Sequence, residues 1–378
     1  EALPARRDWT FGLRPRGLLP ESAGEARLNV AVAGDEVVSV RREIEPPEAW
    51  VREQQREARV AVAVVIPVML LVLGAGSFLL VVGVRMWAQG QLPLRTVALF
   101  AGVALPLLAV TFANGIPAVV AGFDSVLGWP IQFWGWVFAG VLMSTLGAAA
   151  IGLAVGVSRV WLASGADVEG GRAGAIGTGG AIGLGVLVVG VAQMFSLIVD
   201  ALFGEPSRPG RSFEGIDHWM PMATTSLGAV LGMVGAFAAL VFLGAVYRRS
   251  AVSSRVRFAF QVGVGMAAAT AAAMSWSDSP LRGLIGAMAV GAAIYLYAWI
   301  VSRVSRSAIG AAFGLTAFSP LGAITDPSYP GHALGGWIGL VLVGGAMAWM
   351  AREASVFEAP TVRDMHLPQD PWRRSVQR

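Results

Sequence analysis

The chain has 378 residues, of which 55% are hydrophobic and only 14% are charged. Its mean hydropathy of +0.64 is typical of a polytopic membrane protein and excludes an ordinary soluble domain. The formal net charge of +4 comes from arginine, because the sequence has no lysine. The arginines punctuate apolar segments instead of forming one basic face, so we expect no nucleic-acid binding. The absence of cysteine excludes disulfides and Cys-ligated zinc.

Residues 1–58 are predicted to form a small β element followed by a helical stalk. Two segments of alternating polarity, Arg27–Ala33 and Glu36–Ile44, flank Gly34 and Asp35, which is typical of a β-hairpin. The sequence DWTFGLR suggests a third short strand. So few apolar residues cannot make an independent core. We therefore expect this element either to belong to a larger exterior domain or to lean on a partner.

Long charge-free runs recur throughout residues 59–352, which we predict to be the transmembrane domain. A helix of about 20 apolar residues crosses the hydrocarbon core of a bilayer. The longest runs are Val60–Val84, Thr96–Ile116, Ile131–Val157, Ala173–Val199 and Met222–Tyr247. Three shorter runs are also predicted to span: Phe258–Trp276, Gly283–Val301 and Ala333–Met350. Ala308–Ile324 contains Pro320 and is predicted to be either a ninth span or a re-entrant piece.

The charges of the short connections fix the expected orientation, because arginine there is retained on the cytoplasmic side. One set of connections holds Arg85, Arg95, Arg159, Arg172, Arg248, Arg249, Arg255, Arg257, Arg303 and Arg306. The opposite set holds Arg208, Arg211 and Arg282 with Asp124, Asp200, Glu205, Glu214, Asp217, Asp278 and Asp326. We therefore predict that residues 1–58 are extracytoplasmic. Nine spans fit better than eight, because the ninth returns Arg352 to the cytoplasm.

Glycines at four-residue spacing are the most informative residues inside the spans. Where side chains are missing, two helix backbones can approach closely. The candidate helix-packing pairs are Gly152 with Gly156, Gly179 with Gly183, Gly228 with Gly232, and Gly335 with Gly339. Packing within the chain and contact with another subunit both remain open for these pairs.

Few polar residues are candidates for chemistry. Asn114, Gln193 and Gln261 lie in apolar runs, and we predict that they form interhelical hydrogen bonds. Asp217 and His218, in the longest exterior loop, could cap a cavity, although such neighbours are common in loops. No residue is assigned a catalytic, metal-binding or cofactor-binding role.

Residues 353–378 are predicted to form an extended cytoplasmic tail, because the segment is rich in proline and lacks periodicity. Trp372, Arg373 and Arg374 near its end are candidates for contact with anionic headgroups or with a partner protein. We expect the tail to become ordered by such contact.

Short motifs within residues 6–160 carry a resemblance: RRDWTF, VAVAGDEV, PPEAW and FDSVLGWPIQF. Together they resemble the linker and first spans of the bacterial CPBP (CAAX processing and bacteriocin processing) intramembrane protease family. Proteolysis in that family uses Glu-Glu-x-x-x-Arg, Phe-x-x-x-His and His-x-x-x-Asn/Asp motifs on membrane helices. Here every glutamate lies outside the apolar runs, and HLPQD (His366 to Asp370) matches the third motif only in the polar tail. The resemblance implies a member without the catalytic motifs, in the bacterial inner membrane.

The sequence thus predicts an all-α polytopic membrane protein of eight or nine transmembrane helices, with a small extracytoplasmic β-hairpin element. We expect a noncatalytic structural or accessory subunit of a larger complex, in contact with the lipid bilayer and with other membrane protein subunits, and without a cofactor. Two alternatives stay open. One is a CPBP-type protease whose site is displaced or missing. The other is a small-molecule transporter with a cavity near Asn114, Gln193 and the loop after Asp200.

Overall fold

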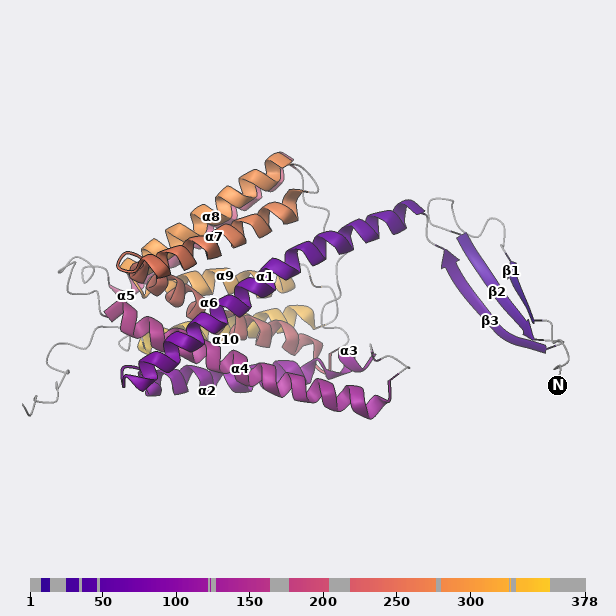
Figure 1. Ribbon diagram of the computed structural model, residues 1–378, viewed down its shortest axis with the longest axis horizontal. Coiled ribbons are helices and arrows are strands. Elements are labelled where there is room, and N and C mark those ends of the chain that lie inside the picture. Colours follow the sequence, from indigo (N-terminus) through magenta and orange to yellow (C-terminus); the bar gives the residue numbers. More distant parts are fainter. Residues whose placement is uncertain are drawn as a thin grey trace, which may run out of the picture. The chain divides into compact units, whose positions relative to one another are not determined.

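A computed structural model describes residues 8–13, 25–33, 36–45, 48–121, 123, 127–163, 177–203, 218–276, 280–325, 327 and 331–353. These residues form a three-stranded sheet and ten helices (Figure 1). The chain divides into two compact units, Glu1–Ile66 and Pro67–Arg378. The boundary between the units falls inside the first helix, α1 (Glu48–Ala88).

The first unit contains an antiparallel sheet in the order β1-β2-β3. Its strands are β1 (Asp8–Leu13), β2 (Glu25–Ala33) and β3 (Glu36–Glu45). The predicted hairpin is therefore present as β2 and β3, and DWTFGLR supplies the third strand. Gly34 and Asp35, predicted to form the turn, lie outside the described residues.

The two faces of the sheet differ in polarity. Paired residues of antiparallel strands lie on the same face, and Trp9, Phe11 and Leu13 of β1 pair with Val32, Val30 and Leu28 of β2. Val30 pairs in turn with Val40 of β3. The opposite face carries small and polar residues: Thr10, Gly12, Asn29, Ala31 and Ser39. One face of the sheet is therefore largely apolar across all three strands, with Arg42 of β3, which pairs with Leu28, as the charged exception.

The second unit is helical. After the end of α1 it contains α2 (Leu94–Asn114), α3 (Ile116–Ala121), α4 (Trp129–Ala163), α5 (Thr178–Phe203), α6 (Pro221–Ser250), α7 (Ser254–Trp276), α8 (Pro280–Arg303), α9 (Ser307–Thr325) and α10 (His332–Glu353). Each predicted span corresponds to one long helix of the chain, α1 included. The short helix α3 corresponds to no predicted span. The ambiguous run Ala308–Ile324 is helical throughout as α9, with Pro320 inside the helix.

The described part of the chain contains six helices that are long and apolar enough to cross a membrane. They are α2, α4, α6, α9, α10 and the stretch Gly283–Arg303 of α8. Two shorter apolar stretches, Val72–Ala88 of α1 and Thr178–Met194 of α5, lie in further helices. The chain is therefore a helical protein with several membrane-spanning helices, as predicted.

Helix α6 is the centre of the helical unit (Figure 1). It packs against α2, α4, α7, α8, α9 and α10. In its most apolar window 56% of the residues are buried, a larger share than in the other five candidate spans. Phe237 of α6 stacks on Phe100 of α2 with ring centroids 5.7 Å apart, and Phe100 also contacts Trp349 of α10 at 5.4 Å.

Some of the candidate glycines lie at close helix contacts, and others face open space. A Cβ on Gly152 would lie 2.5 Å from the Val97 carbonyl oxygen of α2, and one on Gly335 would lie 2.5 Å from the Met222 carbonyl oxygen of α6. Their partners Gly156 and Gly339 are also in tight contacts, with Val97 and Pro320. In contrast, a Cβ on Gly179, Gly183 or Gly228 would meet nothing within 4 Å, whereas Gly232 faces Thr316.

Among the described glycines, two that the spacing did not select lie nearest to the backbone of a neighbouring helix. A Cβ on Gly185 of α5 would lie 2.0 Å from the Ser307 carbonyl oxygen of α9, and one on Gly310 of α9 would lie 1.9 Å from the Ile182 carbonyl oxygen of α5. Both obstacles are backbone atoms, so a side chain at either position would force the two helices apart.

We expect Gly310→Ala to lower the free energy of unfolding by about 1–3 kcal/mol, as overpacking of a tight contact generally does. Gly183→Ala, in the facing helix α5, should be neutral or slightly stabilising, because its added methyl group meets no atom and alanine favours the helix. Thermal unfolding of both variants in the same detergent measures the difference. Equal melting temperatures would show that α5 and α9 do not approach at these glycines.

Candidate functional site

Apart from Arg172, which lies outside the described residues, the arginines predicted to face the cytoplasm lie near helix ends, where several of them join one helix to another. Arg159, near the end of α4, donates a hydrogen bond to Thr96 Oγ1 at the start of α2 (2.8 Å). Arg248, near the end of α6, donates to the carbonyl oxygen of Leu162 in α4 (3.0 Å). Arg306 likewise joins the start of α9 to the start of α5. These bonds hold one end of the helical unit together.

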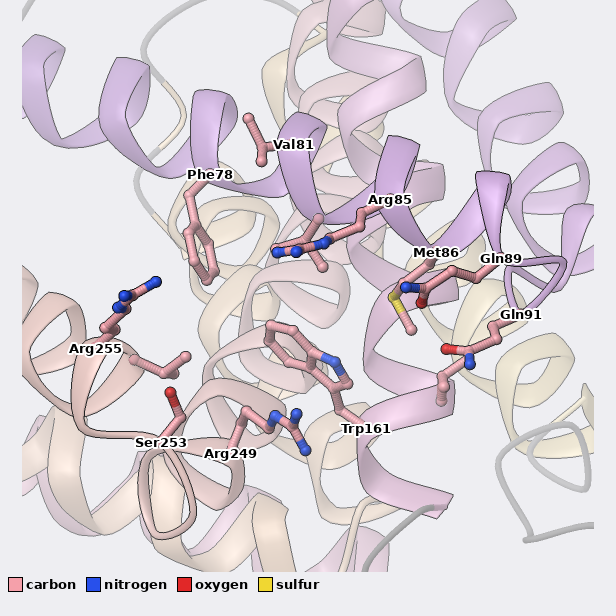
Figure 2. Close-up of a pocket in the computed structure, with 13 residues that line it drawn as sticks. Phe78, Val81, Arg85, Met86, Gln89, Gln91, Trp161, Arg249, Ser253 and Arg255 are labelled. Atoms are coloured by element: carbon pink, nitrogen blue, oxygen red, sulfur yellow. The ribbon is translucent and has the colours of Figure 1, made fainter.

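A cavity of about 600 Å³ opens at this end, between α1, α4 and the turn from α6 to α7 (Figure 2). We call it the Arg85 pocket. Its polar lining residues are Arg85, Gln89, Gln91, Arg249, Ser253 and Arg255. No carboxylate is among the residues that line it, so its lining carries a net positive charge.

The wall of the Arg85 pocket is apolar and aromatic. The rings of Phe78 and Trp161 lie 6.2 Å apart, and each lies within 6.5 Å of Phe242. Met86, which is 6% exposed, packs into the core beside the pocket. Figure 2 shows Arg85, Arg249 and Arg255 arranged around Phe78 and Trp161. A ligand in the pocket would therefore meet cationic groups and an apolar surface together.

The end of α1 positions the α1 side of the pocket. Phe78, Val82 and Met86 recur every four residues and so share the buried face of the helix, with Arg85 and Gln89 beside them. The helix then stops in a Schellman motif, in which Gly90 has φ +68° and donates to the Trp87 carbonyl oxygen. Gln91 donates to the Met86 carbonyl oxygen, which folds it back to the pocket.

Arg85, Arg249 and Arg255 differ from the arginines that join helices. Their side chains are exposed. Within the described ranges they form neither a hydrogen bond nor an ion pair, unlike Arg159 and Arg248. Their guanidinium groups therefore keep their donors available to a ligand.

Asn114 forms a second polar cluster, at the other end of α2. Its Nδ2 donates to the Met220 carbonyl oxygen (3.3 Å) and to Thr224 Oγ1 (3.0 Å), while its Oδ1 accepts from the Met220 backbone N–H (2.8 Å). The backbone N–H of Trp219 donates to the Asn114 carbonyl oxygen (3.1 Å). The amide is thus occupied in fixing the start of α6 to the end of α2, in agreement with the predicted interhelical role.

His218 lies beside this cluster. Its Nδ1 is buried and has no hydrogen-bond partner among the described residues, and its Nε2 is 3.5 Å from where a Cβ on Gly115 would be. Asp217 lies outside the described residues, so the predicted pair is not seen together. Trp372, Arg373 and Arg374 of the tail also lie outside them. Among the residues that the structure describes, no group of three or more His, Cys, Asp or Glu could hold a metal ion.

From the sequence, the pocket arginines are predicted only to lie in cytoplasmic connections, and nothing in their spacing groups them into a site. Arg85, Arg249 and Arg255 are far apart in the chain, and only the packing of α1 against α4 and α6 brings them together. Two features of the sequence could have indicated the site: these arginines are concentrated at one predicted side of the membrane, and Gln89 and Gln91 lie within two turns of Arg85.

No protein-family model, curated protein or solved structure matches the chain. The resemblance to CPBP proteases therefore remains a prediction that rests on short motifs. The class of protein that the fold defines is a helical, multi-pass membrane protein with a small β sheet.

We expect Asn114→Ala to reduce the free energy of unfolding by about 1–3 kcal/mol, because it leaves the Met220 backbone groups without their partners. Thr224→Val removes one of the hydrogen bonds and should cost about 0.6 kcal/mol, as single polar contacts between membrane helices do. Thermal unfolding in detergent ranks the two variants. An Asn114→Ala protein as stable as the unmodified one would contradict a structural role for this amide.

Proposed function

We propose that this chain is a noncatalytic accessory subunit of a larger complex in the bacterial inner membrane. In this proposal the chain crosses the membrane nine times. Residues 1–58 are extracytoplasmic and the tail is cytoplasmic. The resemblance to CPBP proteases, without their catalytic motifs, is part of the proposal. The observation that carries it is the exposed apolar face of the β sheet.

The nine-span topology is supported by the helices and by the charges between them. Each predicted span overlaps one long helix, α9 included, and six of the described helices are long and apolar enough to cross a membrane. The connections α1–α2, α6–α7 and α8–α9 carry arginine, and the positive-inside rule places them in the cytoplasm. The Arg85 pocket and the arginine links between helices lie at that same end.

The sheet supports a partner outside the membrane. Trp9, Phe11 and Leu13 are 53%, 48% and 52% exposed, and Val37 and Val40 are about 60% exposed. Trp9 and Phe11 stack with ring centroids 6.4 Å apart. An apolar sheet face must pack against another layer to be stable in water, and aromatic residues are enriched in protein interfaces. We infer that a second polypeptide covers this face.

A protein suits this face better than the bilayer does. The charged stretch Glu48–Arg59 of α1 separates the sheet from the first apolar run. As a helix this stretch is about 18 Å long, whereas the interfacial layer on each side of the hydrocarbon core is only about 5–8 Å thick. The length of the stalk thus favours a protein that lies beyond the lipid headgroups.

The other functions have less support. A CPBP-type protease needs a carboxylate pair within the membrane, and every glutamate of the chain lies outside the predicted spans. The transporter hypothesis places its cavity near Asn114, whose amide is already occupied by Met220 and Thr224.

Cysteine labelling tests the orientation, because the chain has no native cysteine. Val252, in the α6–α7 turn, is 79% exposed. Gly128, before α4, has room for a side chain, since its added Cβ would meet only Pro130 Cδ at 4.0 Å. In intact cells, stripped of any outer barrier, a membrane-impermeant maleimide should label Gly128→Cys and not Val252→Cys. In permeabilised cells the reagent should label both variants. The reverse labelling pattern in intact cells would overturn the proposed orientation.

Native mass spectrometry after gentle extraction tests the accessory role. The chain of 39.4 kDa should appear within a heavier hetero-complex. The double substitution Trp9→Ala and Phe11→Ala should release it, because it removes the aromatic pair from the apolar face. Thr10→Ala is the matched control: it changes the same strand on the opposite face and should leave the complex intact.

The masses discriminate between the possible occupants of the sheet face. A mass that is a multiple of this chain alone would identify a second copy and contradict an accessory role. A monomer that needs no partner would also contradict an accessory role.

A further inference from the structure

We propose that the Arg85 pocket binds an anionic phospholipid, with the phosphate held by Arg85, Arg249 and Arg255 and an acyl chain lying along the aromatic wall. This inference goes beyond the accessory role and does not depend on it. It requires only that the helical unit lies in a membrane.

Charge and donor geometry favour a phosphate. Three arginines and no carboxylate line the pocket. A guanidinium group presents paired N–H donors that match two oxygens of a phosphate. Because these three side chains are exposed and form no bond within the described ranges, binding a phosphate would break no existing contact. Gln89 and Gln91 add uncharged donors that suit the hydroxyls or ester oxygens of a headgroup.

The depth of the pocket favours a lipid over a soluble phosphate. Arg85 directly follows Val84, the last residue of the first predicted span, and Arg249 closely follows Tyr247, the last residue of another. The guanidinium groups therefore lie at the predicted boundary of the hydrocarbon core, within reach of the lipid phosphates in the adjoining headgroup layer. Basic pockets between membrane helices on the cytoplasmic side recognise anionic headgroups in this way.

The wall provides the apolar half of the recognition. Phe78, Val82 and Trp161 line the pocket, and Val81 beside them is 63% exposed. A soluble phosphate would leave this surface unused, whereas an acyl chain would cover it. The volume of about 600 Å³ lies in the range of small-molecule sites, enough for a headgroup and the upper part of a chain.

Titration of delipidated protein with dioctanoyl phosphatidylglycerol, followed by native mass spectrometry, tests the proposal. The unmodified protein should bind this lipid at least about tenfold more tightly than dioctanoyl phosphatidylcholine, whose net charge is zero. Arg85→Gln should abolish most of this preference. Arg85→Lys should give an intermediate affinity, because it keeps the charge and loses the paired donors.

Arg95→Gln is the matched control. Arg95 is an exposed arginine at the same end of the helical unit and does not line the pocket, so its loss should leave the affinity within about twofold. Ser253→Asp adds a carboxylate to the pocket and should weaken binding as much as Arg85→Gln does. Ser253 directly precedes α7, where aspartate is a favoured N-cap, so this variant should keep its fold.

Three results would overturn the proposal. Equal losses of affinity in Arg85→Gln and Arg95→Gln would show that the lipid responds to general surface charge and not to a specific site. Unchanged affinity in Arg85→Gln and Ser253→Asp would exclude the pocket. Displacement of the lipid by glycerol 3-phosphate or inorganic phosphate at equal concentration would identify a soluble phosphate as the ligand. The accessory role would survive each of these results, because it is tested at the sheet.

Discussion

The close packing of small residues between helices is the constraint on which the helical unit depends. In a bilayer the hydrophobic effect does not drive helices together, so association relies on van der Waals contact and interhelical hydrogen bonds. The glycines at Gly152, Gly185, Gly310 and Gly335 let backbone approach backbone. Large side chains such as Phe237 then fill the spaces that remain beside α6. With six helices around it, α6 fixes where their ends lie, and the ends carry the polar chemistry.

Polar and charged side chains are concentrated at the two ends of the helical unit, because a charge within the hydrocarbon core is costly. At one end, the Asn114 amide ties α2 to the start of α6 without any charged group. At the other end, arginines are concentrated, and they fall into two groups. Arg159 and Arg248 donate hydrogen bonds to neighbouring helices. Arg85, Arg249 and Arg255 face a cavity instead. The cost of charge within the hydrocarbon core thus accounts both for the predicted orientation and for a cationic site at the edge of the helical unit.

The sequence predicted the helices well because most of them contain a long apolar run, and this signal is local. The strands β2 and β3 followed from alternation for the same reason. Tertiary contacts were harder to predict. Regular spacing selected Gly183, which faces open space, whereas Gly185, two residues further on, meets α9 at its backbone. In a helix where glycine is abundant, spacing cannot say which face meets a neighbour. The Arg85 pocket was missed for a related reason, since its residues come from three parts of the chain that only the fold brings together.

The position of α1 explains why a cavity forms at this place. From Phe78 onward, α1 packs on the other helices through a narrow stripe of Leu79, Gly83 and Met86, in which Gly83 rests against Leu153 of α4. Beside the stripe, Val81 and Val84 are more than half exposed. A helix held by one stripe leaves a gap on its flank, and the bulky rings of Phe78 and Trp161 keep that gap from closing. In water such a gap would expose apolar surface, but in a membrane lipid fills it. Because the gap ends at Arg85, an anionic lipid would bind there more tightly than an uncharged one.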